Sequence, residues 1–213
     1  MGFRGYAPGT TVHVIQRGNN KGRIFESAKD STQFLGWLTE AAKTYGLSVH
    51  AYVLMTNHFH LLATLEGKDS LSRAMQSIGI RYTRYFNAAH GRSGTLYEGR
   101  YRSCAIARDD HFLAASRYIE MNAVRAGLAP SPDVYRWSSY KANALGREDA
   151  LITPHEIYVR LGADAETRRT AYRALFEAPS QQFDDTLRAA TNRGIGLEAV
   201  AGLRKPGRPR KAA

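Results

Sequence analysis

The segment LSVHAYVLMTNHFHLLATL, residues 47–65, decides the fold. Its first part alternates apolar and polar residues and is rich in valine and tyrosine, which predicts a strand over 47–55. Thr56 and Asn57 favour a tight turn, and residues 58–65 again have the composition of a strand. Because so short a connection joins antiparallel neighbours, the segment is predicted to form a β-hairpin.

The segments on either side of the hairpin extend it into a sheet with helices. TVHVIQR predicts a strand over 11–17, and apolar residues at helical spacing predict a helix from Asp30 to the stop signal Gly46. A second helix is predicted over 71–89, a strand over 100–107, and a third helix from Asp109 or Asp110 to near Gly127. This β-α-β-β-α-β order followed by a helix is typical of an α+β, ferredoxin-like fold, in which helices pack on one face of an antiparallel sheet.

Charge gives the first indication of function. Thirty Lys and Arg residues against nineteen Asp and Glu residues give a net charge of +11. Such a field attracts polyanions, of which nucleic acid is the first candidate and an anionic membrane the second; a basic surface that serves solubility alone is the alternative. With one cysteine, no apolar run of membrane-spanning length and no secretory leader pattern, we expect a cytoplasmic protein, associated with the nucleoid and not with a membrane.

Three regions follow from the pattern. Residues 1–146 hold the ferredoxin-like domain, 147–202 a helical C-terminal extension, and 203–213 a basic tail, LRKPGRPRKAA, that is expected to be disordered when free. The tail resembles an AT-hook, in which Lys205, Arg208 and Arg210 would reach the minor groove of A·T-rich duplex DNA. A nonspecific basic tail is the alternative.

His58 and His60 are candidate metal ligands. Residues i and i+2 of a strand point to the same face, so the two imidazoles project side by side while Phe59 points to the other face. Paired imidazoles can chelate a divalent metal. The alternative is a pair of partly exposed histidines, and an isolated H-x-H motif is common by chance.

Further candidates lie in RYIEMNAVRAG. Tyr118 and Asn122 are four residues apart and are therefore predicted to share one face of a helix. The side-chain oxygen of Asn122 could complete a metal shell, with Tyr118 one turn away. A core aromatic is the alternative for Tyr118, and an exposed helix position is the alternative for Asn122.

Several stretches together resemble the single-tyrosine HUH transposases, in the branch of REP-associated tyrosine transposases. They cover residues 11–140 in the family's order, and they are VHVIQRGNNKGRIF, HAYVLMTNHFHLL, LSRAMQSIGIRYTRYFN, LYEGRYRSCAI, RYIEMNAVRAGL and YRWSSY. The resemblance implies a ferredoxin-like fold, HFH as the HUH motif, Tyr118 as the nucleophile and Asn122 as the third metal ligand. Ala123 replaces the family's usual proline, a change that suits a helix interior.

The resemblance also implies the reaction. Single-stranded DNA beside hairpins would be cleaved and rejoined through a covalent 5′-phosphotyrosine, with Mg²⁺ or Mn²⁺ as the metal, although imidazole ligands alone would suit zinc or nickel equally well. Two alternatives remain: a non-catalytic protein that binds or regulates hairpin DNA, and a metallohydrolase that uses a zinc-bound water. Monomer and homodimer are both compatible with the sequence.

Several arginines are candidates for phosphate contacts. Arg73, Arg81 and Arg84 fall on one face of the predicted helix over 71–89, apart from its apolar stripe. Arg100 and Arg102 flank Tyr101 on one face of a predicted strand, and Arg17 ends the first strand. An ordinary solvated face is the alternative for the three helical arginines, whereas Cys104 is expected to be a small buried residue.

Overall fold

Four strands form one antiparallel sheet in the order β2-β3-β1-β4. In the computed structural model, which describes residues 5–177 and 181–201, the strands are β1 (Thr11–Arg17), β2 (Leu47–Leu54), β3 (His58–Leu65) and β4 (Arg102–Ile106). The chain leaves β1 through a short 3₁₀ helix, η1 (Asn19–Lys21). The antiparallel ferredoxin-like sheet predicted from the sequence is therefore confirmed, with β1 and β3 as its central strands.

The hairpin of β2 and β3 forms as predicted. Tyr52 lies opposite Leu61 and Leu54 opposite Phe59, and the register shifts once, between Val49 and Ala51. β3 pairs with β1 on its other edge, so that it is hydrogen-bonded on both sides. The strand that carries the two candidate histidines is consequently one of the two central strands of the sheet.

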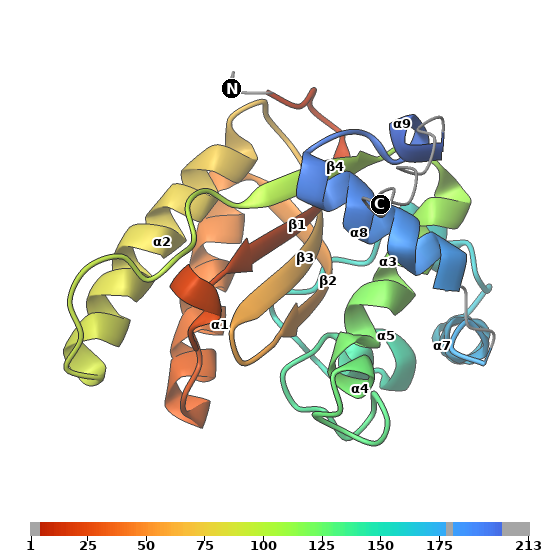
Figure 1. Ribbon diagram of the computed structural model, residues 1–213. Coiled ribbons are helices and arrows are strands. Elements are labelled where there is room, and N and C mark those ends of the chain that lie inside the picture. Colours follow the sequence, from red (N-terminus) through yellow and green to blue (C-terminus); the bar gives the residue numbers. More distant parts are fainter. Residues whose placement is uncertain (1–4, 178–180, 202–213) are drawn as a thin grey trace, which may run out of the picture.

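Two helices cover one face of the sheet. They are α1 (Ala28–Tyr45) and α2 (Ser70–Ala89), which lie side by side to the left of the strands in Figure 1. α1 begins at a capping box, in which the Ser27 hydroxyl accepts from the backbone of Asp30 while the Asp30 carboxylate accepts from the backbone of Ser27. It ends at Gly46, whose left-handed conformation favours glycine. Phe34, Phe59 and Tyr82 pack together in the core between these helices and the sheet.

The other face is covered by helices from the C-terminal half of the chain. α3 (Asp109–Glu120) and α8 (Gln181–Arg193) cross the sheet on the side opposite α1 and α2 (Figure 1). Leu62 and Cys104 from the strands, Ile119 from α3 and Leu187 from α8 form a second buried core. Both faces are thus covered, the second partly by α8, which belongs to the predicted C-terminal extension.

The predicted helix from Asp109 to Gly127 is two helices in the structure. α3 ends at Glu120, Met121 has a turn-like conformation, and α4 (Asn122–Arg125) follows. Arg108 is the N-terminal cap of α3, although the two aspartates that follow it lie in the first turn, where acidic residues stabilise a helix. The remaining helices are α5 (Tyr140–Leu145), α6 (Glu156–Val159), α7 (Ala165–Ala174) and α9 (Leu197–Ala201). No helix within the described ranges is long and apolar enough to span a bilayer.

Candidate active site

A cavity of about 120 Å³ opens on the face of the sheet that carries α3 and α8. Its lining comes from five elements that are distant in the sequence. The lining residues are His13, Ile15 and Arg17 of β1, His58 and His60 of β3, Tyr118 of α3, Asn122 of α4, and Arg188, Thr191 and Asn192 of α8. The structure therefore brings the predicted nucleophile, the three predicted metal ligands and Arg17 into one place.

Strand alternation explains why the β-strand residues meet. β1 and β3 pair so that Arg17 lies opposite His58 and Ile15 opposite His60. These side chains share one face with His13, while the intervening residues, such as Phe59, point into the core under α1 and α2. The side-by-side placement of the two histidines is confirmed.

The orientation of His58 is fixed by its neighbour Asn57. The Asn57 side-chain nitrogen donates to the Lys21 carbonyl at 2.9 Å, which leaves its Oδ1 as an acceptor. Nδ1 of His58 lies 2.7 Å from that oxygen. Because an amide oxygen can only accept, Nδ1 carries the proton and Nε2 of His58 has a free lone pair.

The orientation of His60 is set by a longer chain of hydrogen bonds. The Thr191 hydroxyl donates to the Leu187 carbonyl at 2.8 Å, and Nδ1 of His13 lies 2.7 Å from the same hydroxyl oxygen. Since the hydroxyl proton points to the carbonyl, His13 donates from Nδ1 and its Nε2 accepts. That Nε2 lies 2.8 Å from Nδ1 of His60. His60 is therefore protonated on Nδ1, and its Nε2 also has a free lone pair.

Burial keeps these imidazoles neutral. Desolvation lowers the pKa of His13 to about 3. Desolvation, followed by the nearby positive charge of Arg17, lowers the pKa of His58 to about 4. The pKa of His60 is also lowered well below its usual value, chiefly by desolvation. Two neutral imidazoles with free Nε2 atoms are the form in which histidine binds a metal ion.

Asn122 lies at the break between α3 and α4. Its Nδ2 donates hydrogen bonds to the carbonyls of Tyr118 at 3.0 Å and Ile119 at 3.4 Å. The lone pairs of Oδ1 are therefore left to coordinate a metal ion. Among the described residues, no group of three or more His, Cys, Asp or Glu side chains could hold a metal ion. Two imidazole nitrogens and one amide oxygen that line the same cavity are a set of atoms that could hold a divalent cation.

Tyr118 lies beside the histidines, and only 2% of its surface is exposed. Its ring meets those of His13 and His60 edge-on, with centroids 5.8 Å apart in each case. On its other side the Arg125 guanidinium lies 4.2 Å from the ring centroid. The predicted alternative of a core aromatic describes its burial correctly, but the ring also lines the cavity.

Asp184 of α8 anchors the helices that carry Tyr118 and Asn122. Its carboxylate is buried and forms ion pairs with Arg117 of α3 and Arg125 of α4. Arg125 also donates to the Tyr118 carbonyl at 2.9 Å. The break at Met121 is therefore supported by a buried charge cluster, which holds Tyr118 and Asn122 in fixed positions.

The predicted DNA-binding arginines fall into three groups. Arg17 lines the candidate active site, and Arg100 and Arg102 line an adjoining hollow; Arg100 precedes β4, which starts two residues later than predicted. Arg73, Arg81 and Arg84 lie on α2, on the opposite side of the sheet, where Arg73 covers Tyr45 and Arg81 pairs with Glu40 at 2.7 Å. Lys205, Arg208 and Arg210 lie outside the described residues.

Sequence reasoning missed His13 and Thr191. His13 interrupts the apolar strand TVHVIQR two and four positions before Ile15 and Arg17, so it shares their face, and β1 is the neighbour of β3 in the predicted fold. Those two observations together would have been enough to predict that His13 lies beside His60. Thr191 lies in an unremarkable helix 131 residues after His60, and nothing in the sequence connects the two.

Comparison with known proteins identifies the family. The model of the family described as "Transposase IS200 like" matches residues 7–122, which include β1, the two histidines, Tyr118 and Asn122. The chain belongs to the IS200-like transposase family. In this transposase the family region ends at Asn122, so α8 and its contribution to the cavity lie beyond it.

A solved structure shares the fold of this transposase. A REP-associated tyrosine transposase bound to a REP hairpin aligns with a TM-score of 0.55 and 19% identity, over 73% of this chain and 92% of the other. A putative transposase from Deinococcus radiodurans has a TM-score of 0.40 and 16% identity, over 60% of this chain and 92% of the other. A search of curated proteins gave no match.

Proposed function

We propose that this transposase cleaves and rejoins single-stranded, hairpin-containing DNA through Tyr118, with a divalent metal ion held by His58, His60 and Asn122. The observation that carries the proposal is the meeting of a phenol and two neutral imidazoles in one cavity. The Nε2 atoms of both imidazoles are left free by hydrogen bonds behind them. A phenol beside a pair of imidazoles that can bind a metal ion is suited to attack a phosphate.

The reaction follows from the chemistry of a phosphodiester. When held by His58, His60 and Asn122, Mg²⁺ or Mn²⁺ would supply Lewis-acid polarisation of the phosphoryl oxygens. The Tyr118 oxygen forms a bond to phosphorus and loses its proton, while the bond from phosphorus to the 3′ oxygen breaks and that oxygen gains a proton. The products are a 5′-phosphotyrosine and a 3′-hydroxyl, and a 3′-hydroxyl can reverse the step and join strands. Arg17, at the rim beside His58, is suited to hold an adjacent phosphate.

Hairpin DNA is the substrate that the resemblance implies, and a solved relative of the same fold is bound to a REP hairpin. The net charge of +11 supports a polyanionic partner. We propose further that the basic tail around Lys205, Arg208 and Arg210 adds contacts to A·T-rich duplex DNA.

A covalent adduct tests the proposal. The protein is incubated with labelled hairpin DNA and Mg²⁺ or Mn²⁺, and the products are separated under denaturing conditions. The wild type should form a protein–DNA adduct that is lost in Tyr118→Phe and in chelator, while DNA binding by Tyr118→Phe stays within about twofold of wild type. Tyr135→Phe, which changes a tyrosine outside the cavity, is the matched control.

Two results would overturn the proposal. Hairpin binding without any adduct would favour a non-catalytic protein, and metal-dependent cleavage that persists in Tyr118→Phe would favour a metal-bound water as the nucleophile.

A further inference from the structure

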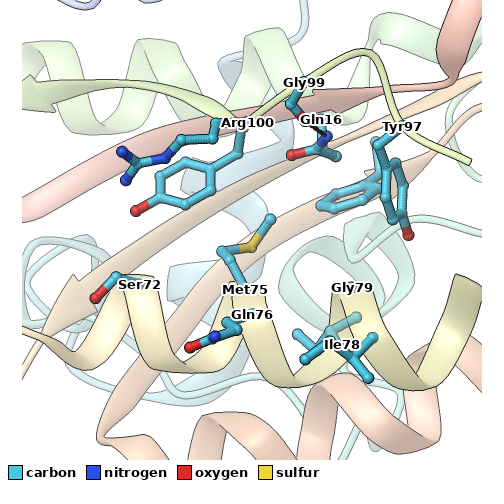
Figure 2. Close-up of a pocket in the computed structure, with 12 residues that line it drawn as sticks. Gln16, Ser72, Met75, Gln76, Ile78, Gly79, Tyr97, Gly99 and Arg100 are labelled. Carbon is cyan, nitrogen blue, oxygen red and sulfur yellow. Dashed lines mark hydrogen bonds between the residues drawn. The ribbon is translucent and has the colours of Figure 1, made fainter. Parts of the chain in front are cut away.

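A larger cavity, of about 570 Å³, lies on the other face of the sheet from the candidate active site. It opens between α2 and the segment that leads into β4, as Figure 2 shows. Phe59 and Met75 give it apolar walls, and Tyr101 and Arg100 line it from the segment before β4. Its size admits a nucleobase with part of its sugar, whereas the candidate active site is much smaller.

Gln16 is a polar side chain directed into this cavity. It occupies a position of β1 that faces the apolar core, and 6% of its surface is exposed. Its Nε2 donates to the Gly99 carbonyl at 3.1 Å, which fixes the orientation of the carboxamide. Figure 2 shows the carboxamide oxygen turned away from Gly99, toward the side of Met75 and Arg100.

A carboxamide oxygen has two acceptor positions, so the Gln16 oxygen can accept a hydrogen bond from a ligand in the cavity. An N–H donor from a ligand would therefore add a hydrogen bond inside a largely apolar cavity.

A basic path connects this cavity to the candidate active site. An intermediate hollow contains Arg17, Arg100 and Arg102 together with one carboxylate, that of Glu98. It shares Arg17 with the cavity around His58 and His60, and it shares Arg100 with the cavity beneath Gln16. Three guanidinium groups along one edge of the sheet are complementary to successive phosphates of one strand.

We infer that the cavity beneath Gln16 binds one unpaired base of the single-stranded DNA whose phosphates run along Arg17, Arg102 and Arg100 from the candidate active site. The base lies between Phe59, Met75 and Tyr101 and donates an N–H to the oxygen of Gln16. All four DNA bases can present an N–H donor and an apolar face. The inference rests on the proposed function in one respect: the DNA strand is taken to pass through the candidate active site. It does not require that the strand is cleaved.

Gly79 offers a variant that fills the cavity. It lies on α2 at the cavity wall, and a side chain added there would meet no atom within 4 Å at its first carbon. Leucine favours a helix more than glycine does, so Gly79→Leu should keep the fold while it occupies the space of the base. Gly36→Leu on α1 is the matched control, because Gly36 is also helical, also open, and remote from the cavity. Gln16→Met removes the acceptor and keeps the length of the side chain.

The experiment compares two probes of equal charge, a thymidine oligonucleotide and an abasic oligonucleotide of the same length. All proteins carry Tyr118→Phe and are studied without metal, so neither cleavage nor the metal site enters the result. The parent protein should prefer the thymidine probe, and Gly79→Leu should reduce that preference by about tenfold, within the range for one stacked base. Gln16→Met should reduce it by a smaller factor, and Gly36→Leu should leave it unchanged.

The methyl resonance of Met75 supplies a second measurement, which is simple because the chain has four methionines. The thymidine probe should shift it through the ring current of the base, the abasic probe should not, and the shift should vanish in Gly79→Leu. An unmoved Met75 resonance at saturating thymidine probe, or an unchanged preference in Gly79→Leu, would overturn the inference. If the base site is found but Tyr118 forms no adduct with hairpin DNA, the proposed function fails and the base site stands.

Discussion

Nε2 of His13 lies 2.8 Å from Nδ1 of His60, so a residue of β1 lies directly behind a proposed metal ligand on β3. Nδ1 of His13 in turn forms a hydrogen bond with the Thr191 hydroxyl on α8. Because that hydroxyl donates its proton to the Leu187 carbonyl, His13 is the donor to Thr191. Groups behind a ligating histidine hold its tautomer and ring orientation. A threonine outside the family region therefore orients His60, a proposed metal ligand, through His13.

Removal of the Thr191 hydroxyl should weaken metal binding. Thr191→Val keeps the shape of the side chain but leaves Nδ1 of His13 without its acceptor, so the tautomers of His13 and His60 are no longer fixed. We expect a tenfold to hundredfold loss of Mn²⁺ affinity, roughly the effect of removing a group behind a metal ligand. Calorimetric titration measures the affinity, and nitrogen NMR of the imidazoles reports the tautomers in the metal-free protein.

Thr191→Ser is the control for this prediction, because it keeps the hydroxyl and should keep the affinity within about twofold. If valine and serine behaved alike and the His60 tautomer did not change, the role of the hydrogen-bond chain would be disproved.

Asp184 should be essential for stability, unlike its neighbour Asp185. Asp184 is buried between Arg117 and Arg125, and Asp184→Asn leaves those two guanidinium groups without a counterion. We expect a loss of about 3–5 kcal/mol in the free energy of unfolding, measured by urea denaturation. Asp185 pairs with Arg188 on the surface, so Asp185→Asn should cost less than about 1 kcal/mol. Equal losses in the two variants would contradict this assignment.

Glu120 should make stability depend on pH. Burial raises the pKa of its carboxyl to about 7, although Ser139, Asn143 and Tyr172 donate hydrogen bonds to it. Because the folded pKa lies above the unfolded value of 4.5, the folded protein binds the extra proton. The stabilisation is complete below about pH 4.5 and is lost as the pH rises to about 7, by on the order of 3 kcal/mol.

Glu120→Gln tests this expectation by removing the titrating group while an amide of similar shape keeps an acceptor for Ser139 and Asn143. The variant should lose most of the slope of unfolding free energy against pH between 4.5 and 7. A slope as steep as that of the wild type would show that another group titrates there.

The effect of an arginine on the salt dependence of DNA binding should depend on its position in the fold. Arg17 lines the candidate active site, and Arg17→Ala should lower the slope of log affinity against log salt concentration for single-stranded DNA by about 0.7. Arg81 lies on the opposite side of the sheet in an ion pair with Glu40, so Arg81→Ala should leave the slope nearly unchanged. Binding titrations at several salt concentrations measure both. A larger effect at Arg81 would restore the α2 face as the DNA-binding surface.

The order of secondary structure could be read from the sequence. Hydrophobic periodicity and stop signals such as Gly46 are local, and the strands β1 and β3 were predicted with the bounds that the structure has. The break at Met121 could not be predicted, because Ala123, two positions later, favours a continuous helix. It depends on Arg125 and Asn122 binding the Tyr118 carbonyl, and Asp184 holds that arginine from a distant helix.

By itself, the sequence determined which side chains are the candidates for the chemistry: HFH places two imidazoles on one strand face, and the six family blocks point to Tyr118 and Asn122. Only the tertiary structure decided how those groups are oriented. The proton position on His60 depends on His13 and Thr191, which are 47 and 131 residues away in the chain, and hydrogen bonds between such distant residues leave no local pattern. The cavity beneath Gln16 likewise arises only where β1, α2 and the segment before β4 come together.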